Sequence, residues 1–158
     1  TTTHTQAGKC RLFLMEFEIG YLGLLLTSFL AATFLPITSE VFLVSMLVLG
    51  YDPLISILYA SVGNAAGGWL NYFIGRLGNP EWLKRLKISQ DKILSWKSKV
   101  QRFGHWLGLL SWLPLIGDVM ATALGFFRSP WVPSFLFIFI GKFLRYLIIV
   151  LWFKLGWL

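Results

Sequence analysis

Long apolar stretches without charged side chains alternate with short polar segments along this chain. Residues 19–39 carry no charge, and neither do residues 53–75. Each stretch provides the roughly 20 apolar residues that a helix needs to cross the hydrocarbon core of a bilayer. A third stretch, 131–152, is interrupted only by Lys142 and Arg145. The pattern therefore predicts three spanning helices.

Two shorter apolar segments each contain a proline followed four positions later by an acidic residue. LPITSEV holds Pro36 and Glu40 directly after the first predicted span (19–35), and LPLIGDV holds Pro114 and Asp118. Proline removes a backbone donor and interrupts a helix, so each segment predicts a helix break followed by a short helical piece. These pieces are too short to cross a bilayer comfortably, which is typical of buried or re-entrant segments.

The two proline segments have matching surroundings. Each short piece ends near a glycine, is followed by a turn that contains a proline, and leads into a predicted spanning helix. If the first span starts inside the cell, the first segment dips into the membrane from outside and the second dips from inside. The repeat then becomes an inverted structural repeat, and discontinuous segments at corresponding positions are the best sequence pointer to a transporter's site.

These elements predict an all-α integral membrane protein with about three spanning helices, two re-entrant helical hairpins in an inverted repeat and a cytoplasmic amphipathic helix. We expect residues 1–15 to be a disordered or non-native extension, because the start of the chain is polar and patternless. Residues 16–158 are expected to form a single membrane domain. Its first half is 16–75, its basic loop 76–105 and its second half 106–158.

Composition excludes an ordinary soluble domain. The chain is 56% hydrophobic and 13% charged, whereas soluble domains carry about 25% charged residues. The single cysteine, Cys10, excludes an internal disulfide or a cysteine metal cluster. His4 and His105 lie far apart in the sequence, so we expect neither a metal nor another cofactor.

The positive charge is concentrated in one loop. Eight of the fourteen basic residues lie between Arg76 and Arg102, and a short basic loop between apolar spans is typical of the cytoplasmic side. We prefer this interpretation to nucleic-acid binding. Apolar residues recur within the loop at three- and four-residue steps: Ile93, Trp96, Val100 and Phe103. This spacing predicts an amphipathic helix on the membrane surface, where basic side chains attract anionic lipid.

Two acids in apolar surroundings are the candidate transport residues. A membrane carboxylate costs on the order of 2.5–3.5 kcal/mol on insertion scales. We therefore expect Glu40 and Asp118 to face one shared wet cavity and to act as proton or counter-ion sites. Lys142 and Arg145, on one face of the last helix, and Arg128 are the candidates for binding a lipid phosphate. In the alternative, Lys142 and Arg145 neutralise the two acids and Arg128 extends to the interface.

The second predicted span contains small and amide residues on one face. Gly63 and Gly67 form a G-x-x-x-G pair, and Asn64 and Asn71 lie close to them. Small residues allow another helix to approach, and asparagines hydrogen-bond across such contacts. We expect helix packing here, with a polar cavity lined by Asn64 as the alternative. Pro36 and Pro114 are assigned to the same packing or cavity region.

Four motifs in this order resemble the small YqaA-type branch of the DedA (SNARE-associated, VTT-domain) membrane proteins: LPITSEVFLVSMLVLG, GNAAGGWLNYFIGR, SWLPLIGDVMATALGFFR and GKFLRY. The resemblance covers about residues 20–150 and implies two re-entrant hairpins of opposite orientation with membrane-embedded charges. It also implies lipid movement, through relatives linked to undecaprenyl phosphate or phosphatidylethanolamine and to the proton motive force. Glu40 matches the acid of the family's first hairpin. The second hairpin departs from the pattern: larger members carry arginines flanking its proline, whereas here Ser111 and Asp118 stand nearby. The basic groups come instead from Arg128 and Arg145.

We therefore expect a lipid flippase or scramblase, proton-coupled, that moves a phosphate-bearing lipid in a bacterial inner membrane, with loop 76–105 in the cytoplasm. The expected partners are a membrane phospholipid or polyprenyl phosphate, protons and, because the monomer is thin, a second copy of the chain, but no nucleic acid. The alternative is a non-transporting packing or assembly protein with internal salt bridges. Enzymatic activity is not expected, since the chain offers no nucleophile with a base and no metal set.

Overall fold

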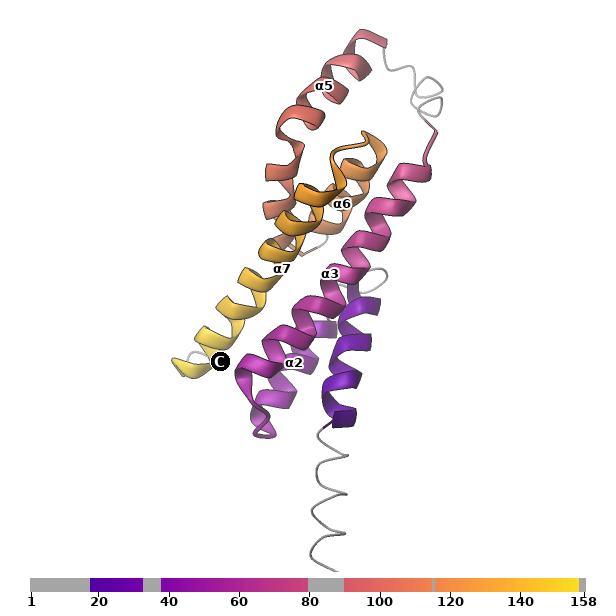
Figure 1. The fold of residues 1–158 in the computed structure, drawn as a ribbon. Helices are drawn as coiled ribbons and strands as arrows, with labels where there is room; N and C mark the ends of the chain where they lie inside the picture. The colour runs from indigo at the N-terminus through magenta and orange to yellow at the C-terminus, as the bar shows by residue number, and fades with distance from the viewer. Residues whose placement is uncertain (1–17, 33–37, 80–89, 115, 157–158) are drawn as a thin grey trace, which may run out of the picture.

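The computed structural model describes residues 18–32, 38–79, 90–114 and 116–156, and their regular structure is entirely helical (Figure 1). This confirms the predicted all-α fold. Pro36 and residues 1–15 lie outside the described residues. The described elements are the first helix (Glu18–Ala32), α2 (Thr38–Val48), α3 (Pro53–Leu77), α5 (Gln90–Leu107), the 3₁₀ helix η1 (Gly108–Trp112), α6 (Ile116–Phe126) and α7 (Trp131–Lys154).

Two long helices, α3 and α7, form the centre of the molecule. They have 25 and 24 residues and are therefore about 37 and 36 Å long at 1.5 Å per residue. The helices run in opposite directions (Figure 1): near one end Ile57 packs in the same core as Tyr146, and near the other Tyr72 packs with Ile138. The shorter helices pack against these two.

The number of apolar spans differs from the sequence prediction. Among the described residues, α7 is the one helix both long and apolar enough to cross a bilayer. The α3 helix is long enough, but the glycines and asparagines of its middle lower its hydropathy. The first helix, Glu18–Ala32, is one of the shorter apolar helices, of 10–17 residues. Of the predicted span over 19–35 the structure describes the residues up to Ala32, and this part lies alongside α3.

The first helix and α2 form an antiparallel pair beside α3. Near the start of the first helix, the hydroxyl of Tyr21 accepts a hydrogen bond from the backbone N of Asp52, 3.1 Å away, just before α3 begins. At its end, the carbonyl of Ala32 accepts a bond from Asn71 Nδ2 at 2.9 Å, late in α3. The first helix therefore runs in the same direction as α3, and α2, which leads directly into the start of α3, runs in the opposite direction.

A second antiparallel pair packs against the other end of the bundle. It consists of α5 with η1, and of α6, which runs back to the start of α7. The predicted break at Pro114 is confirmed, because η1 ends at Trp112 and α6 begins at Ile116. A Cβ on Gly141 of α7 would lie 2.8 Å from the carbonyl oxygen of Leu109, so glycine allows η1 to approach α7 closely. The predicted amphipathic helix is α5.

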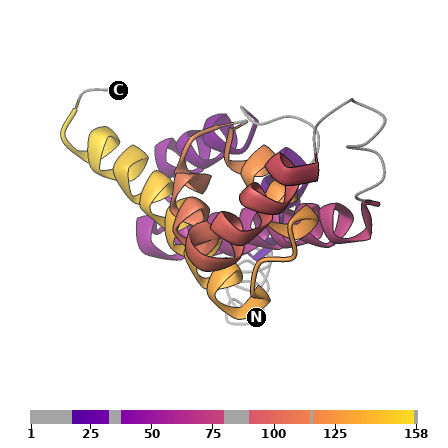
Figure 2. The same cartoon turned by 90° about the horizontal axis from the view of Figure 1, so that it is seen from above.

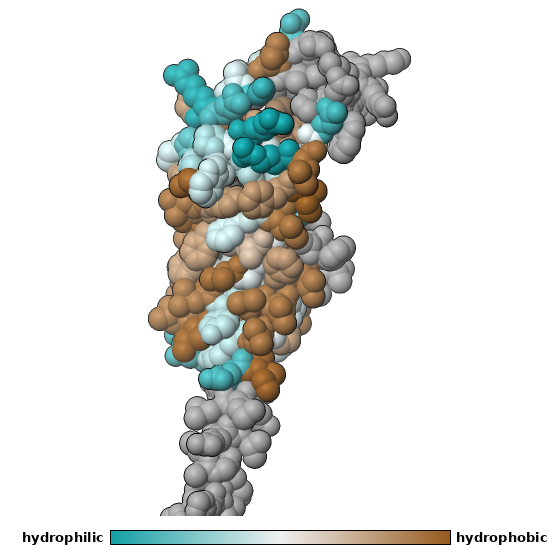
Figure 3. Space-filling view, turned by 45° about the vertical axis from the view of Figure 1, so that its right-hand side comes forward, coloured by the Kyte–Doolittle hydropathy of each residue, from teal (hydrophilic) through white to brown (hydrophobic). Residues whose placement is uncertain are grey.

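Apolar side chains cover the outside of the bundle. Leu22, Leu26 and Leu30 of the first helix are each more than half exposed, and large apolar residues of α7 are exposed as well. Figure 3 shows a broad hydrophobic zone over the middle of the visible face, with hydrophilic residues gathered at one end. Seen from above, the C-terminal end of α7 lies at the edge of the bundle (Figure 2). Buried polar residues and exposed apolar ones suit a protein whose solvent is lipid.

Candidate functional site

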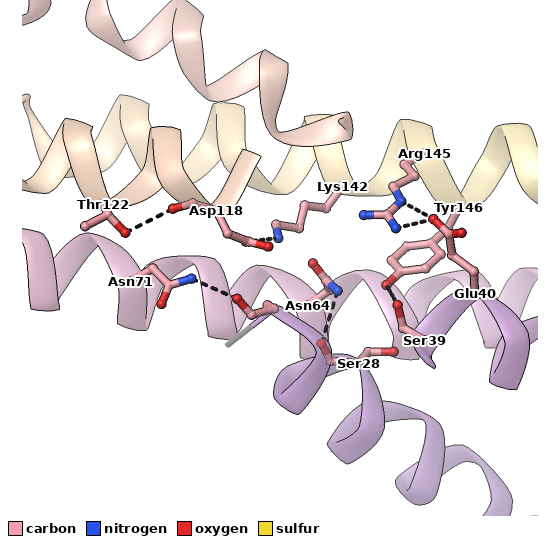
Figure 4. A network of polar contacts seen from close by, with 11 residues as sticks. Ser28, Ser39, Glu40, Asn64, Asn71, Asp118, Thr122, Lys142, Arg145 and Tyr146 are labelled. Carbon is pink, nitrogen blue, oxygen red and sulfur yellow. Dashed lines mark hydrogen bonds and ion pairs between the residues drawn. The ribbon is translucent and has the colours of Figure 1, made fainter. Parts of the chain in front are cut away.

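The polar centre of the molecule lies where the two short helices begin (Figure 4). The helices α2 and α6 both have 11 residues, and each carries its acid in the first turn, Glu40 in α2 and Asp118 in α6. Both short helices direct these acids towards α7, which carries Lys142 and Arg145. The three-residue spacing of these cations places them on one face of that helix. Four charged side chains therefore meet between the two apolar cores.

Asp118 and Lys142 form a nearly buried ion pair. The Nζ atom of Lys142 lies 2.6 Å from Oδ1 of Asp118, and the two side chains are 2% and 19% exposed. The lysine stem passes over α3, where a Cβ on Gly68 would lie 3.3 Å from Lys142 Cε. A small residue at this position thus makes room for a large cation. Removing one partner of such a pair would leave a buried charge without compensation.

Glu40 and Arg145 form a second pair, which is more open on the acid side. Arg145 Nε donates to Glu40 Oε1 at 2.7 Å, and Nη2 of the same guanidinium contacts the same oxygen. The arginine side chain is 7% exposed, whereas that of Glu40 is 34% exposed. Beside this pair, the hydroxyl of Tyr146 donates to Ser39 Oγ at 3.0 Å. The start of α2 is therefore attached to α7 by two adjacent polar contacts.

An open recess adjoins the second pair between α2 and α7. Its volume is about 460 Å³, and its lining consists of Glu40, Val41, Val44, Ser45 and Ile149. Asp118 does not line this recess. Each acid is held by a different cation on α7, and the expectation that both acids face one shared cavity stays a prediction.

The asparagines of α3 bind the first helix. Asn64 Nδ2 donates to the carbonyl of Ser28 at 3.1 Å, and Asn71 Nδ2 donates to the carbonyl of Ala32, one turn further along the same helix. A Cβ on Gly63 would lie 2.2 Å from the carbonyl oxygen of Leu25, and one on Gly67 would be 2.5 Å from Ala32 Cβ. These contacts favour the helix-packing interpretation of the glycines and asparagines. The Asn64 Oδ1 atom is buried and has no hydrogen-bond partner among the described residues.

Arg128 is not brought to the central pairs. It lies exposed in the turn between α6 and α7, with a left-handed φ of 55°. Its predicted role in the same phosphate site as Arg145 and Lys142 therefore receives no support from its position. An exposed arginine at the end of the bundle suits the alternative, in which the side chain reaches the interface.

Sequence reasoning missed three residues of this centre. Tyr146 and Ser39 flank the residues of one ion pair, and Gly68 accommodates the lysine of the other. The signal that could have identified them is their position: Tyr146 directly follows Arg145, Ser39 directly precedes Glu40, and Gly68 directly follows the glycine pair of α3. Polar residues beside a membrane charge tend to share its hydrogen-bond network, because unpaired polar groups are costly in lipid.

Comparison with known proteins identifies the family of this chain. The model of the VTT domain matches residues 35–155, which include both short helices and both ion pairs. Two proteins named "Inner membrane protein YqaA", from Escherichia coli K12 and Shigella flexneri, are 38% identical over 133 residues, which cover 84% of this chain and 89% of theirs. A protein of Haemophilus influenzae, described as uncharacterized, is 38% identical over 77% of this chain and 79% of its own. No solved structure matches the chain. The chain therefore belongs to the VTT-domain (DedA) family of membrane proteins, and within it is similar to the YqaA proteins.

Proposed function

We propose that this protein is a multi-pass transporter of a bacterial inner membrane, a flippase or scramblase for a phosphate-bearing lipid. The observation that carries the proposal is the Glu40–Arg145 pair beside an apolar recess of about 460 Å³. A guanidinium binds phosphate well, because its planar array of donors matches the phosphate oxygens. The valines and isoleucine of the recess offer a surface for the adjoining lipid chains. The inner-membrane location follows the names of the relatives.

The proposed topology has two spanning helices, α3 and α7, and two re-entrant hairpins that enter from opposite sides. Support comes from the antiparallel pairs described above and from the matching 11-residue helices, each with its acid in the first turn. Each of these helices leads through a proline-containing turn into a long helix, as in an inverted repeat. The first helix then belongs to a hairpin, which replaces the full crossing expected from hydropathy.

The basic end of the molecule is proposed to face the cytoplasm. Arg76, at the end of α3, and Arg102 of α5 belong to this end, as does Arg128. Short loops rich in lysine and arginine are retained on the cytoplasmic side. The turn between α2 and α3 and the C-terminal end of α7 then face the opposite side.

We propose that α2 moves during transport while α6 stays in place. A Cβ on Gly125 would lie 1.8 Å from the carbonyl oxygen of Tyr72, so the backbones of α6 and α3 are in direct contact. Tyr72 also bonds to the carbonyl of Ser129, which fixes the turn after α6. By contrast, α2 is held at its start by Glu40 and Ser39 and borders an open recess.

Proton uptake by Glu40 would link this movement to a proton gradient. A protonated Glu40 carries no charge, so its attraction for Arg145 weakens and the guanidinium can bind an incoming phosphate instead. Loss of the proton restores the pair after the lipid has left. Asp118 and Lys142, nearly buried, hold the second hairpin in this scheme.

The test measures lipid movement in vesicles that contain the purified full chain, with and without a pH gradient. Labelled phosphatidylethanolamine and a polyprenyl phosphate serve as two candidate substrates. We expect Glu40→Gln and Arg145→Gln to abolish movement, while Asp91→Asn, a change to an exposed acid on α5, leaves it intact. Absence of movement by the natural sequence with either lipid, or full movement by Glu40→Gln, would refute the proposal.

A packing or assembly role is the second candidate function. The observation that favours it is the pairing of each acid with one cation at 2.6–2.7 Å, which suffices to stabilise the fold. In that case the double change Glu40→Arg with Arg145→Glu restores both folding and cellular role, since the attraction is symmetric. If the protein is a transporter, the same double variant should fold but lose lipid movement, because its guanidinium then lies on α2 and not on α7.

A further inference from the structure

A second recess lies far from the Glu40 site, between α5 and α6. Its volume is about 240 Å³, and its lining is apolar apart from Lys99. Val100 of α5, Ala123 of α6 and Phe127, which directly follows α6, are among the residues that line it. The recess is partly open to the outside of the molecule, so a hydrocarbon chain can enter it, and its apolar lining offers water few hydrogen-bond partners.

The surroundings of this recess are basic and amphipathic. Lys97, Lys99 and Arg102 are exposed on α5. On the same helix Phe103 is 58% exposed and Trp106 is 56% exposed. Aromatic and basic side chains together on one helix are typical of a segment at the headgroup level of a membrane. The recess therefore opens where anionic headgroups are available.

We propose that this recess binds one acyl chain of an anionic phospholipid, whose headgroup contacts Lys99. The narrow volume accommodates a chain but not a helix of a partner protein, since a helix with side chains is about 10 Å across. The charge of Lys99 selects an anionic headgroup over a neutral one. The bound lipid fills the gap between α5 and α6 and thereby holds α5 against the bundle. The site is distinct from the proposed transport site and does not depend on lipid movement.

The structure offers a matched pair of lysines for the test. Lys97 and Lys99 are both exposed on α5, but only Lys99 lines the recess. Their side chains point about 160° apart around the helix, because each residue advances the helix by about 100°. If α5 is only attracted to an anionic surface in general, substitution of either lysine weakens lipid binding equally. If the lipid binds in the recess, substitution of Lys99 weakens binding more than substitution of Lys97.

The experiment is native mass spectrometry of the full chain, purified in mild detergent, stripped of lipid and supplied with phosphatidylglycerol, phosphatidylethanolamine or oleate. We expect retention of phosphatidylglycerol over phosphatidylethanolamine, and a loss of about fivefold or more in Lys99→Glu, as expected for one basic contact. Ala123→Phe, which fills the recess, should also release the lipid, and Lys97→Glu should retain it.

Several results would overturn the proposal. Equal losses in Lys97→Glu and Lys99→Glu would indicate surface attraction alone, and equal retention of phosphatidylethanolamine would exclude selection by charge. Tighter binding of oleate would assign the recess to a free fatty acid. If Ala123→Phe misfolds, as judged by size-exclusion chromatography, Ala123→Leu replaces it, and Lys99→Glu still decides because its side chain is exposed. Because this site does not depend on lipid movement, the vesicle assay is repeated with these variants. Lost lipid binding together with unchanged lipid movement distinguishes this site from the proposed transport site.

Discussion

Arg145 and Glu40 lie 105 residues apart in the chain, yet Arg145 Nε and Glu40 Oε1 are 2.7 Å apart. The next residue of α7, Tyr146, binds the preceding residue of α2, Ser39, at 3.0 Å. Consecutive residues of one helix thus meet consecutive residues of the other in opposite order. This double contact fixes the beginning of the first short helix on the centre of α7, beside an open recess.

The buried ion pair is expected to dominate stability. Asp118→Asn leaves Lys142 charged, 2% exposed and without its carboxylate, so we expect a loss of about 3–5 kcal/mol, as for other broken buried pairs. The measurement is thermal unfolding of the purified protein in detergent. The double change Asp118→Leu with Lys142→Met should recover most of the lost stability, because no charge then remains buried. A double variant as unstable as the single one would contradict this explanation.

Glu40→Gln should destabilise the protein less than Asp118→Asn. Glu40→Gln leaves the charge of Arg145, which is 7% exposed and faces the more open side of its pair, whereas Asp118→Asn leaves that of Lys142, which is 2% exposed. Solvent therefore screens the remaining charge of the first pair more effectively. The same unfolding experiment compares the two single variants side by side. Equal losses, or a larger loss in Glu40→Gln, would contradict the prediction. They would show that burial does not decide how much each ion pair contributes to the free energy of unfolding.

The glycine contact between α3 and α6 predicts a steric effect. A Cβ on Gly125 would lie 1.8 Å from the Tyr72 carbonyl oxygen, so Gly125→Ala must push the two helices apart. We expect a cost of about 1–3 kcal/mol or more, as in other overpacked interiors. Gly23→Ala is the control, because its Cβ would lie at an ordinary 3.6 Å from Phe42. In a helix this control gains up to about 1 kcal/mol of intrinsic propensity.

The position of the first helix can be tested by single-cysteine labelling in intact cells, after Cys10→Ser. If the first helix and α2 form a hairpin, Glu18→Cys and Leu49→Cys react with an impermeant reagent from the same side, and Lys97→Cys reacts from the other. A first helix that crosses the membrane fully would place Glu18→Cys on the opposite side from Leu49→Cys. All three positions are exposed in the structure, so the side of the membrane on which each lies, and not burial in the protein, decides whether it is labelled.

Asn71 is expected to contribute modestly to helix association. Its Nδ2 donates to the Ala32 carbonyl at 2.9 Å, and hydrogen bonds between membrane helices average about 0.6 kcal/mol. Asn71→Ala should therefore lower stability by about that amount in thermal unfolding. A loss above about 2 kcal/mol would mean that this residue also supports the segment that follows Ala32.

The sequence by itself determined the class of protein and its local breaks. Uncharged apolar stretches and a low fraction of charged residues indicate a lipid environment, because soluble folds cannot bury so much apolar surface. The helix break at Pro114 and the basic amphipathic helix follow from local rules of backbone geometry and periodicity. Both are present in the structure, and the family motifs recognised in the sequence match the VTT domain over residues 35–155.

Only the tertiary structure decided how these elements meet. Helical spacing places Lys142 and Arg145 on one face, but it does not state that Lys142 binds Asp118, Arg145 binds Glu40, and Arg128 lies apart. Hydropathy likewise does not state that the first helix and α2 run antiparallel beside α3, since both are apolar along their length. The choice depends on contacts between residues far apart in the chain, where glycines permit close backbone approach and charges require partners.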